Sequence, residues 1–444
     1  MGADMRASFG GKLVAILAAA GSAIGLGSIW RFPYVAGENG GAAFLLVYLL
    51  AIFVVGIPVM VAEFAVGRST KKNAVGGYRQ LAKGWRWLGY SGIVAALFIS
   101  GYYYIIAGWS LEYFVGSFGS LYDDGVNFSA QFGAFQTSWR PLIYMVIFVV
   151  LTHIIIARGV QDGIEKASKV MMPMLFVMVL AIAVYSLTLP GAGKGVDYLF
   201  NPDFSKIDGK ACAAALGQAF FSLSLGFGTI MTYASYVDKK ENPLFQSTAT
   251  AVSDLMFALI AGVAIMPAVF AFGLNPQSGP GLVFETLPYV FSQMPAGGII
   301  AIVFFIALLV AALTSSISML EVAVAYLVEE KGFTRIRSCI VLFAACWAVG
   351  ALCSLSFGPL SDVKIAGSSI FDFFDSLSSN VLMTLGSLLT VLFVGWSLKK
   401  TDIYDEFTNG GSLSTNVKIF GILWFLIRYV CPLAIIFIFI SGLM

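Results

Sequence analysis

Long runs of apolar residues recur along the whole chain and dominate its pattern. A helix needs about 20 apolar residues to cross the hydrocarbon core of a bilayer. By that measure we expect eleven membrane-spanning helices, over residues 13–36, 42–67, 88–116, 140–158, 168–190, 211–236, 248–274, 297–328, 338–354, 368–397 and 417–442. The pattern therefore predicts an all-α polytopic membrane protein.

The composition agrees with this pattern and excludes several other classes of protein. Apolar residues make up 59% of the chain and charged residues 11%, where soluble domains have about 45–50% and about 25%. The net charge of +2 provides no basic surface for a nucleic acid. The sequence contains neither an HExxH motif nor a paired intramembrane Asp motif, so we expect no intramembrane enzyme.

The distribution of Lys and Arg predicts how the chain sits in the membrane. Basic residues favour cytoplasmic loops. If the N-terminus is inside and the spans alternate, most of the 26 Lys and Arg residues fall on the inner side. We therefore expect a cytoplasmic N-terminus and an outside C-terminus. The segments 119–139 and 191–210 are then expected to be non-helical outer loops.

Two of the expected spans contain residues that weaken a helix near its middle. They are Gly21–Ser28, with the sequence GSAIGLGS, and Ser222–Gly228, with the sequence SLSLGFG. Each Gly costs a helix about 1 kcal/mol, and unpaired backbone groups inside a bilayer cost several kcal/mol unless another group replaces the lost bonds. Close helix packing through small residues is the alternative explanation. These runs interrupt spans 1 and 6, which are the equivalent first spans if spans 1–5 and 6–10 are two related halves. We therefore expect two broken helices around a binding site.

A third polar feature lies in the eighth expected span. Thr314, Ser315 and Ser316 are adjacent hydroxyl residues, and uncharged oxygen atoms suit hard cations. The alternative is that each hydroxyl bonds back to a helix carbonyl about one turn earlier. The residues alone leave both possibilities open.

Several longer motifs resemble the signatures of neurotransmitter:sodium symporters. They are GSAIGLGSIWRFPYVAGENGG (Gly21–Gly41), GIPVMVAEFAVGR (Gly56–Arg68), QAFFSLSLGFG (Gln218–Gly228), TYASY (Thr232–Tyr236) and ALTSSIS (Ala312–Ser318). The similarity runs from Arg6 to the C-terminus. Within the family, the sequence resembles bacterial members such as the bacterial leucine transporter. The resemblance implies a single transporter domain over 1–444, located in the bacterial cytoplasmic (inner) membrane.

The resemblance also implies a five-plus-five inverted repeat with broken helices 1 and 6. The first repeat would cover about 8–190 and the second about 205–398, and an extra helix would lie at about 417–442. Glu63 belongs to a family-like motif, and we expect it to bond exposed backbone near the break in span 6.

Two sodium sites are implied by the same resemblance. The second sodium would be held by Gly21, Ile24, Ala311, Thr314 and Ser315. The first sodium would be held by Ala23, Ser222 and a residue of span 7, which is Ser253 or, as we favour, Asp254. The family adds an Asn at the position of Ser28. Because this chain has Ser28 instead of Asn, the number of coupled sodium ions can be one or two. Coupling to protons through Asp254 is a further possibility.

The resemblance further implies a substrate pocket with an apolar lining. The expected residues are Ala23, Leu26, Gly27, Ile99, Tyr103, Phe221, Ser224, Phe227, Ser315 and Met319. Amides of Leu26 and Gly27 with the Tyr103 hydroxyl would bind a carboxylate. Carbonyls of Ala23 and Phe221 with Ser224 would bind an ammonium group. Amine-selective relatives carry an Asp at the position of Gly25, so this chain is expected to take a neutral, hydrophobic amino acid.

The resemblance also implies residues that close the transport path on each side, and an overall function. Arg31 and Asp375 would close the outer path, and Arg6 and Glu329, with Tyr236 nearby, would close the inner path. Phe257 or Ala258 stands where chloride-dependent relatives have a Ser, so we expect no chloride requirement. The sequence predicts a sodium-coupled symporter that works by alternating access. The alternatives are a proton-driven or single-sodium carrier and a transport-inactive amino-acid sensor.

Overall fold

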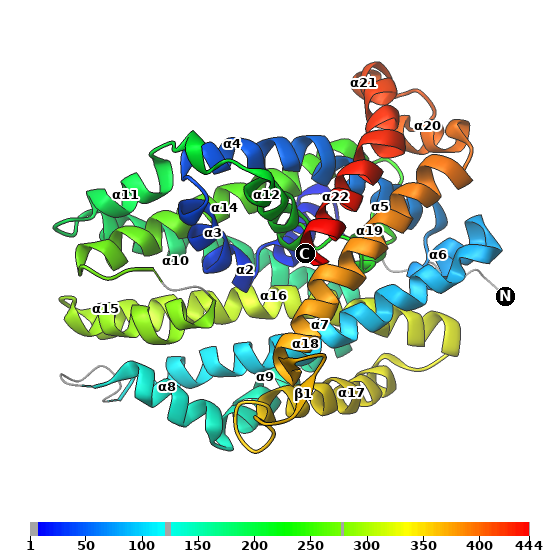
Figure 1. Cartoon of the computed structure of the whole chain (residues 1–444). Helices are drawn as coiled ribbons and strands as arrows, with labels where there is room; N and C mark the ends of the chain where they lie inside the picture. The colour runs from blue at the N-terminus through cyan, green and yellow to red at the C-terminus, as the bar shows by residue number, and fades with distance from the viewer. Residues whose placement is uncertain (1–7, 120–125, 277–278, 444) are drawn as a thin grey trace.

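The structure, a computed structural model, describes residues 8–119, 126–276 and 279–443. Helices form nearly all the regular structure in these ranges, and they pack against one another around a buried apolar core (Figure 1). A short antiparallel hairpin of β1 (Lys364–Ile365) and β2 (Ser368–Ser369) precedes α18. The expectation of an all-α membrane protein is confirmed.

Nine helical stretches in the described ranges are long and apolar enough to cross a membrane. They are Ala42–Thr70, Lys83–Gly116, Arg140–Ala157, Val160–Leu187, Pro243–Ala271, Gly297–Lys331, Arg335–Leu355, Ile370–Ser397 and Ser414–Ser441. Each corresponds to one of the expected spans. The total of eleven crossings and the repeat boundaries stay predictions.

Most of these stretches join α-helices to single turns of another helix type. Their α-helices are α4 (Ala42–Ala51), α5 (Ile57–Thr70), α7 (Arg86–Gly116), α9 (Arg140–Ala157), α10 (Lys166–Leu187), α14 (Pro243–Ala271), α16 (Gly297–Lys331), α17 (Arg335–Leu355), α18 (Ile370–Ser376), α19 (Met383–Leu392), α21 (Ser414–Phe425) and α22 (Cys431–Leu443). Their π-helical turns are η1 (Ile52–Gly56), η4 (Val160–Glu165), η7 (Leu377–Leu382), η8 (Phe393–Ser397) and η9 (Leu426–Val430). A 3-10 turn, η2 (Lys83–Trp85), begins the stretch that contains α7.

The two spans with mid-span glycines are broken, as expected. The first consists of α1 (Lys12–Ala23), α2 (Leu26–Ile29) and α3 (Arg31–Glu38), and the second of α12 (Gly209–Ser222) and α13 (Thr229–Ala234). Ser224, Gly226 and Gly228 adopt positive φ in the second break, where glycine is the residue that suffers least strain. Glycine residues therefore favour the backbone conformation found in the second break.

The expectation that the segments 119–139 and 191–210 are non-helical is wrong for the described residues. They contain α8 (Phe128–Thr137), α11 (Gly193–Phe200) and the 3-10 turn η5 (Phe204–Lys206). The Asn127 side chain caps α8 by accepting a hydrogen bond from the Ala130 amide at 3.0 Å, which is a common way to start a short helix. Other short helices connect the long ones: α6 (Ala74–Leu81), η6 (Leu282–Thr286), α15 (Leu287–Gln293) and α20 (Lys400–Thr408).

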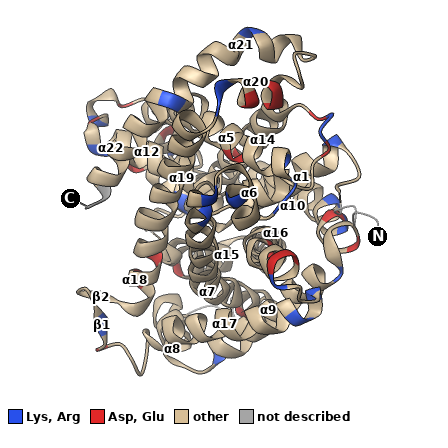
Figure 2. Ribbon diagram, turned by 90° about the vertical axis from the view of Figure 1, so that its right-hand side faces the viewer, with Lys and Arg blue, Asp and Glu red and all other residues tan. Residues whose placement is uncertain are grey.

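One face of the molecule carries the beginning of the described chain, α6 and α20. Figure 2 looks at this face and shows Lys and Arg gathered around α6 and near the turn between α16 and α17. This arrangement is what the predicted orientation requires of a cytoplasmic face. The orientation itself stays a prediction.

The second break packs directly against α19. A Cβ atom added at Gly386 would lie 1.8 Å from the carbonyl oxygen of Gly226. Two backbones meet at this point, and neither can move without shifting its helix. Glycine at 386 is therefore required by close approach rather than by its own backbone conformation.

Gly386→Ala should destabilise the protein because the added methyl group forces the break away from α19. Overpacking of this kind costs about 1–3 kcal/mol, and the melting temperature in detergent should fall accordingly. Gly421→Ala is the matched control, since it is also inside a helix and its new Cβ would meet nothing within 4 Å. Equal melting temperatures for the two variants would contradict the close packing.

Candidate functional site

The break in the first span directs backbone oxygen atoms at α16. The Ser315 Oγ lies 3.4, 3.3 and 3.2 Å from the carbonyl oxygens of Gly21, Ser22 and Ile24. A hydroxyl has one proton to donate, so it serves one of these three acceptors well. The remaining oxygen lone pairs converge on the same place, which suits a hard cation such as Na⁺.

The residues expected at the second sodium site lie together at this point. Thr314 Oγ1 donates to the carbonyls of Val310 at 3.2 Å and Ala311 at 3.0 Å. Its Cβ lies 3.2 Å from the place a Cβ on Gly21 would take. Thr314 thus bonds back to its own helix, as the alternative interpretation proposed, while Ser315 faces the break. The donor set is neutral and consists of oxygen atoms.

A buried carboxylate lies between the two broken spans. Ser28 Oγ donates to Asp254 Oδ1 at 3.0 Å, and Ser222 Oγ donates to Oδ2 at 2.5 Å. Asp254 is fully buried, and among the described residues no Lys or Arg forms an ion pair with it. Ser253, the other candidate on α14, is half-buried and makes no side-chain hydrogen bond in the described ranges. Asp254 is therefore the residue that meets Ser28 and Ser222.

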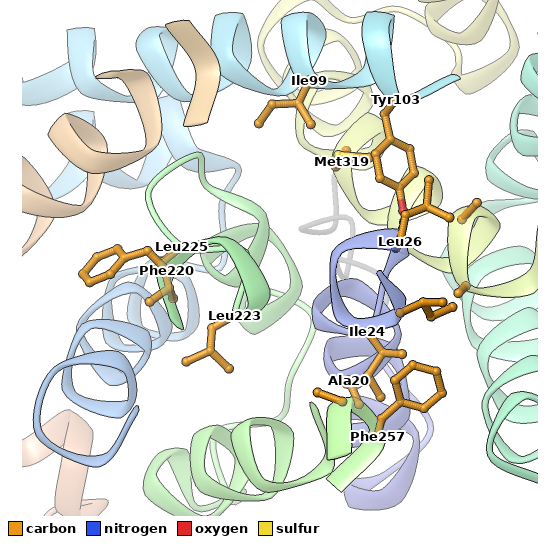
Figure 3. Packing of buried hydrophobic residues seen from close by; sticks show 14 of the residues in the cluster. Ala20, Ile24, Leu26, Ile99, Tyr103, Phe220, Leu223, Leu225, Phe257 and Met319 are labelled. Carbon is orange, nitrogen blue, oxygen red and sulfur yellow. Dashed lines mark hydrogen bonds between the residues drawn. The ribbon is translucent and has the colours of Figure 1, made fainter. Parts of the chain in front are cut away.

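A cavity of about 40 Å³ lies between the two breaks, α7 and α16. Its lining contains every residue expected for the substrate: Ala23, Leu26, Gly27, Ile99, Tyr103, Phe221, Ser224, Phe227, Ser315 and Met319. Ser22, Gly25, Ser28, Ser222 and Met383 complete the lining. Figure 3 shows Ile99 and Tyr103 projecting from α7, with the tyrosine directed at Leu26. Two segments that are far apart in the sequence thus meet around one enclosed space.

The polar atoms of this cavity come from the backbone, Tyr103 and serines. The Tyr103 hydroxyl accepts a hydrogen bond from the Leu26 amide at 3.2 Å. Ser224, which has a φ of 53°, donates to the carbonyl of Ser22 at 2.9 Å. A Cβ at Gly25 would lie 2.8 Å from Ser315 Oγ and 3.1 Å from the Tyr103 hydroxyl. No side chain fits at that position without displacing one of them.

The side chain of Glu63 compensates the second break. Its Oε1 accepts a hydrogen bond from the Gly226 amide at 2.7 Å, as expected from its motif. The carboxylate reaches from α5 and replaces a helix bond that Gly226 has lost.

A second cavity of about 430 Å³ adjoins the central one. Both Arg31 and Asp375 line it, and Leu26, Gly27, Tyr103 and Phe221 line both cavities, so these four residues lie between the two spaces. The Arg31 guanidinium lies 5.1 Å from the centre of the Phe221 ring. Asp375 accepts a hydrogen bond from Ser379 at 3.2 Å. The residues expected at the outer gate thus line one cavity next to the central one, and their role as a gate stays a prediction.

The opposite side is closed by contacts with the end of the second broken span. The Tyr236 hydroxyl donates to Glu321 Oε1 at 2.7 Å, and Arg335 binds both oxygens of Glu321 at 3.0 and 2.6 Å. The backbone amide of Phe9 donates to the carbonyl of Tyr236 at 2.9 Å. These bonds tie the start of the described chain to the segment after α13.

Among the described residues, Glu329 contacts Asn73, and its expected pairing with Arg6 stays a prediction. The Oε2 of Glu329 accepts from the backbone and side-chain amides of Asn73, both at 2.9 Å. Arg6 lies outside the described residues. Beside this region the Lys71 ammonium group donates to the carbonyl of Val237, and burial lowers the pKa of Lys71, opposed by the charge of Asp238.

Some residues of the site gave no signal in the sequence. Met383 on α19 is one apolar residue in an apolar span, and Arg335 is one basic residue at a helix start. Their positions depend on how distant helices pack. The in-span acid Glu321 was visible, because charged residues are rare in such segments, but its partner was not.

Comparison with known proteins places this arrangement in a family. The profile of the sodium:neurotransmitter symporter family matches residues 6–124 and 131–444. An uncharacterised sodium-dependent transporter of Bacillus subtilis is 41% identical over 439 residues, covering 97% of this chain and 96% of that protein. Another uncharacterised sodium-dependent transporter, from Haemophilus influenzae, is 36% identical over 455 residues, covering 99% and 98%.

Similarity extends to a solved structure, that of MhsT in complex with L-phenylalanine. The two folds agree with a TM-score of 0.90 at 43% sequence identity, and the match covers 98% of this chain and 100% of that chain. The family, the relatives and the fold are those of transporters and not of enzymes. The protein with two broken spans around a central cavity belongs to the sodium:neurotransmitter symporter family.

Proposed function

We propose that this protein is a symporter that uses sodium to move a neutral, hydrophobic amino acid into the cell by alternating access. One observation carries the proposal: the cavity at the junction of the two breaks has an apolar lining and polar backbone atoms, and no charged side chain lines it among the described residues. A ligand of this cavity has to bring its own charges. A zwitterion with an apolar side chain has that chemistry.

The two ends of such a zwitterion would find different partners. The amide of Gly27 and the hydroxyl of Tyr103 would receive the carboxylate, and carbonyl oxygens of the breaks with Ser224 would receive the ammonium group. Ile99, Phe227 and Met319 would contact the side chain. The structure of MhsT was solved as a complex with L-phenylalanine, which supports an amino acid of this class.

Sodium would bind at two places beside the substrate. At the second site, Ser315 and the carbonyls of Gly21 and Ile24 form the neutral oxygen cluster described above. At the first site, Asp254 takes the central place between Ser28 and Ser222. A bound cation would offset the cost of a buried carboxylate.

The number of sodium ions decides how strongly transport can be driven. One charge moving through 100 mV is worth about 2.3 kcal/mol, and a tenfold sodium gradient adds about 1.4 kcal/mol. One ion would then support roughly a few hundredfold accumulation, and two ions about the square of that.

A second candidate is a carrier driven by protons or by a single sodium ion. It is favoured by the two hydroxyl hydrogen bonds to Asp254, which would also suit a carboxyl group that gains and loses a proton. A transport-inactive amino-acid sensor is a further alternative, since binding alone needs only the cavity. We propose no chloride requirement, because Phe257 is buried against Phe176 and provides no polar group.

Purified protein in lipid vesicles should accumulate labelled phenylalanine when sodium is higher outside. Replacing all sodium by choline should stop the uptake, because the cation sites would be empty. Uptake that continues in choline and follows a pH gradient would contradict sodium coupling and favour the proton-driven carrier. Binding without uptake, measured by a sodium-dependent shift in melting temperature, would favour the sensor.

Thr314→Ala combined with Ser315→Ala should abolish sodium-dependent uptake, because both hydroxyl ligands of the second site are lost. Ser316→Ala is the control: its buried hydroxyl lies in the same stretch and has no partner among the described residues. The measurement is initial uptake rate against sodium concentration. Unchanged sodium dependence in the double variant would refute the assignment.

Asp254→Asn should raise the sodium concentration for half-maximal uptake about tenfold, which corresponds to about 1.4 kcal/mol. The amide keeps one oxygen atom but removes the charge that attracts the ion. Ser253→Ala, one residue earlier, should leave the value unchanged, and Ser28→Asn should lower it. If Ser253→Ala weakens sodium dependence and Asp254→Asn does not, the first-site assignment is wrong.

A further inference from the structure

An arginine lies within the last membrane-spanning stretch, away from the transport path. Arg428 belongs to the π-helical turn η9, in the apolar stretch Ser414–Ser441. Its guanidinium carbon lies 4.4 Å from the ring centre of Trp396 and 5.6 Å from that of Tyr429. We call these three residues the Arg428 cluster.

The charge of Arg428 has no acidic partner among the described residues. None of the ion pairs there includes it, and its Nε is buried without a hydrogen-bond partner. A charged residue in a membrane span is costly and normally pairs with another group. The two aromatic rings offer cation–π attraction, but they leave the N–H donors of the fork unsatisfied.

The backbone holds this cluster in place from two different spans. The Trp396 indole nitrogen donates to the carbonyl oxygen of Arg428 at 3.0 Å. Gly395 lets the helices approach closely, since a Cβ there would lie 3.1 Å from the Arg428 Cα. Trp396 and Arg428 both lie in π-helical turns, η8 and η9, a feature frequently found at functional sites. The guanidinium is therefore positioned by the fold and is more than a freely moving surface group.

The two aromatic residues of the cluster lie on the outside of the helix bundle, and one of them, Trp396, lies at the end of a span. Trp396 is 56% exposed and Tyr429 is 43% exposed. Trp396 is next to the last residue of the stretch Ile370–Ser397, and Lys399 and Lys400 follow after one intervening leucine, Leu398. Lipid headgroups occupy this level of a bilayer, and aromatic and basic residues are enriched there. The contact with Trp396 brings the guanidinium of Arg428 to the level at which the stretch Ile370–Ser397 ends.

We propose that the Arg428 cluster binds the phosphate group of a membrane phospholipid. A guanidinium presents parallel N–H donors that match two phosphate oxygens, and basic pockets between membrane helices are known to hold lipid headgroups. Arg428 would donate to the phosphate, while Trp396 and Tyr429 would pack along the glycerol and upper acyl chains. The bound lipid would fasten the stretch Ser414–Ser441 to the stretch Ile370–Ser397.

Native mass spectrometry of the purified protein, titrated with phosphatidylglycerol in a mild detergent, tests this proposal. The affinity for the most tightly held lipid should fall about tenfold in Arg428→Gln, because the charged fork is lost. The affinity of Arg428→Lys for the lipid should lie between those of Arg428→Gln and the unmodified protein, because lysine keeps the charge but lacks the paired donors. Lys418→Gln is the control, because it removes the same charge from an exposed position on the same helical stretch and should bind like the unmodified protein.

Equal lipid affinity in Arg428→Gln and the unmodified protein would overturn the proposal. If inorganic phosphate raises the melting temperature as much as phosphatidylglycerol does, the site binds free phosphate, and the proposal of a lipid ligand is overturned. If Arg428→Gln does not fold, judged by circular dichroism and gel filtration, Trp396→Leu carries the test: it should weaken lipid binding, and unchanged affinity would again contradict the cluster. None of these outcomes depends on which amino acid the protein transports.

Discussion

Where a helix is interrupted inside a bilayer, its free N–H and C=O groups cannot form hydrogen bonds to water. The centre of this protein is organised around that constraint. The break before α2 and the break before α13 lie side by side, so the groups they free face one enclosed space. Glu63 serves the Gly226 amide from one side. Ser315 serves carbonyl oxygens of the first break from the other. What these side chains leave unsatisfied is available to ligands.

The same reasoning explains why so few charges are found at the centre. Two buried acids of the described residues are reached by several donors: Asp254 by the hydroxyls of Ser28 and Ser222, and Glu321 by Tyr236 and Arg335. The first of these groups lies next to the cavity, because Ser28 and Ser222 also line it. The second lies at the end of the second broken span, where Tyr236 follows α13. Each carboxylate is thus tied by hydrogen bonds to a broken span or to the segment that follows it.

Much of the centre could be read from the sequence because its chemistry is local. Glycine runs in an apolar span have few explanations, and the residues expected to face the substrate all line the cavity. Contacts between distant helices could not be read. The pairing of Arg335 with Glu321 and the contribution of Met383 depend on tertiary packing. The helix α8 was missed because it is short, and only its Asn127 cap marks its start.

Gly25 connects the proposed cation contact of this site with the proposed substrate contact. Relatives that favour amines would need an acid at this position, but a side chain there would meet the Ser315 hydroxyl and the Tyr103 hydroxyl. Ser315 belongs to the proposed cation cluster and Tyr103 to the proposed carboxylate contact. A single substitution at Gly25 would therefore disturb both proposed contacts, the one for the cation and the one for the carboxylate. An acid at this position would fit only if the residues around Ser315 and Tyr103 changed as well.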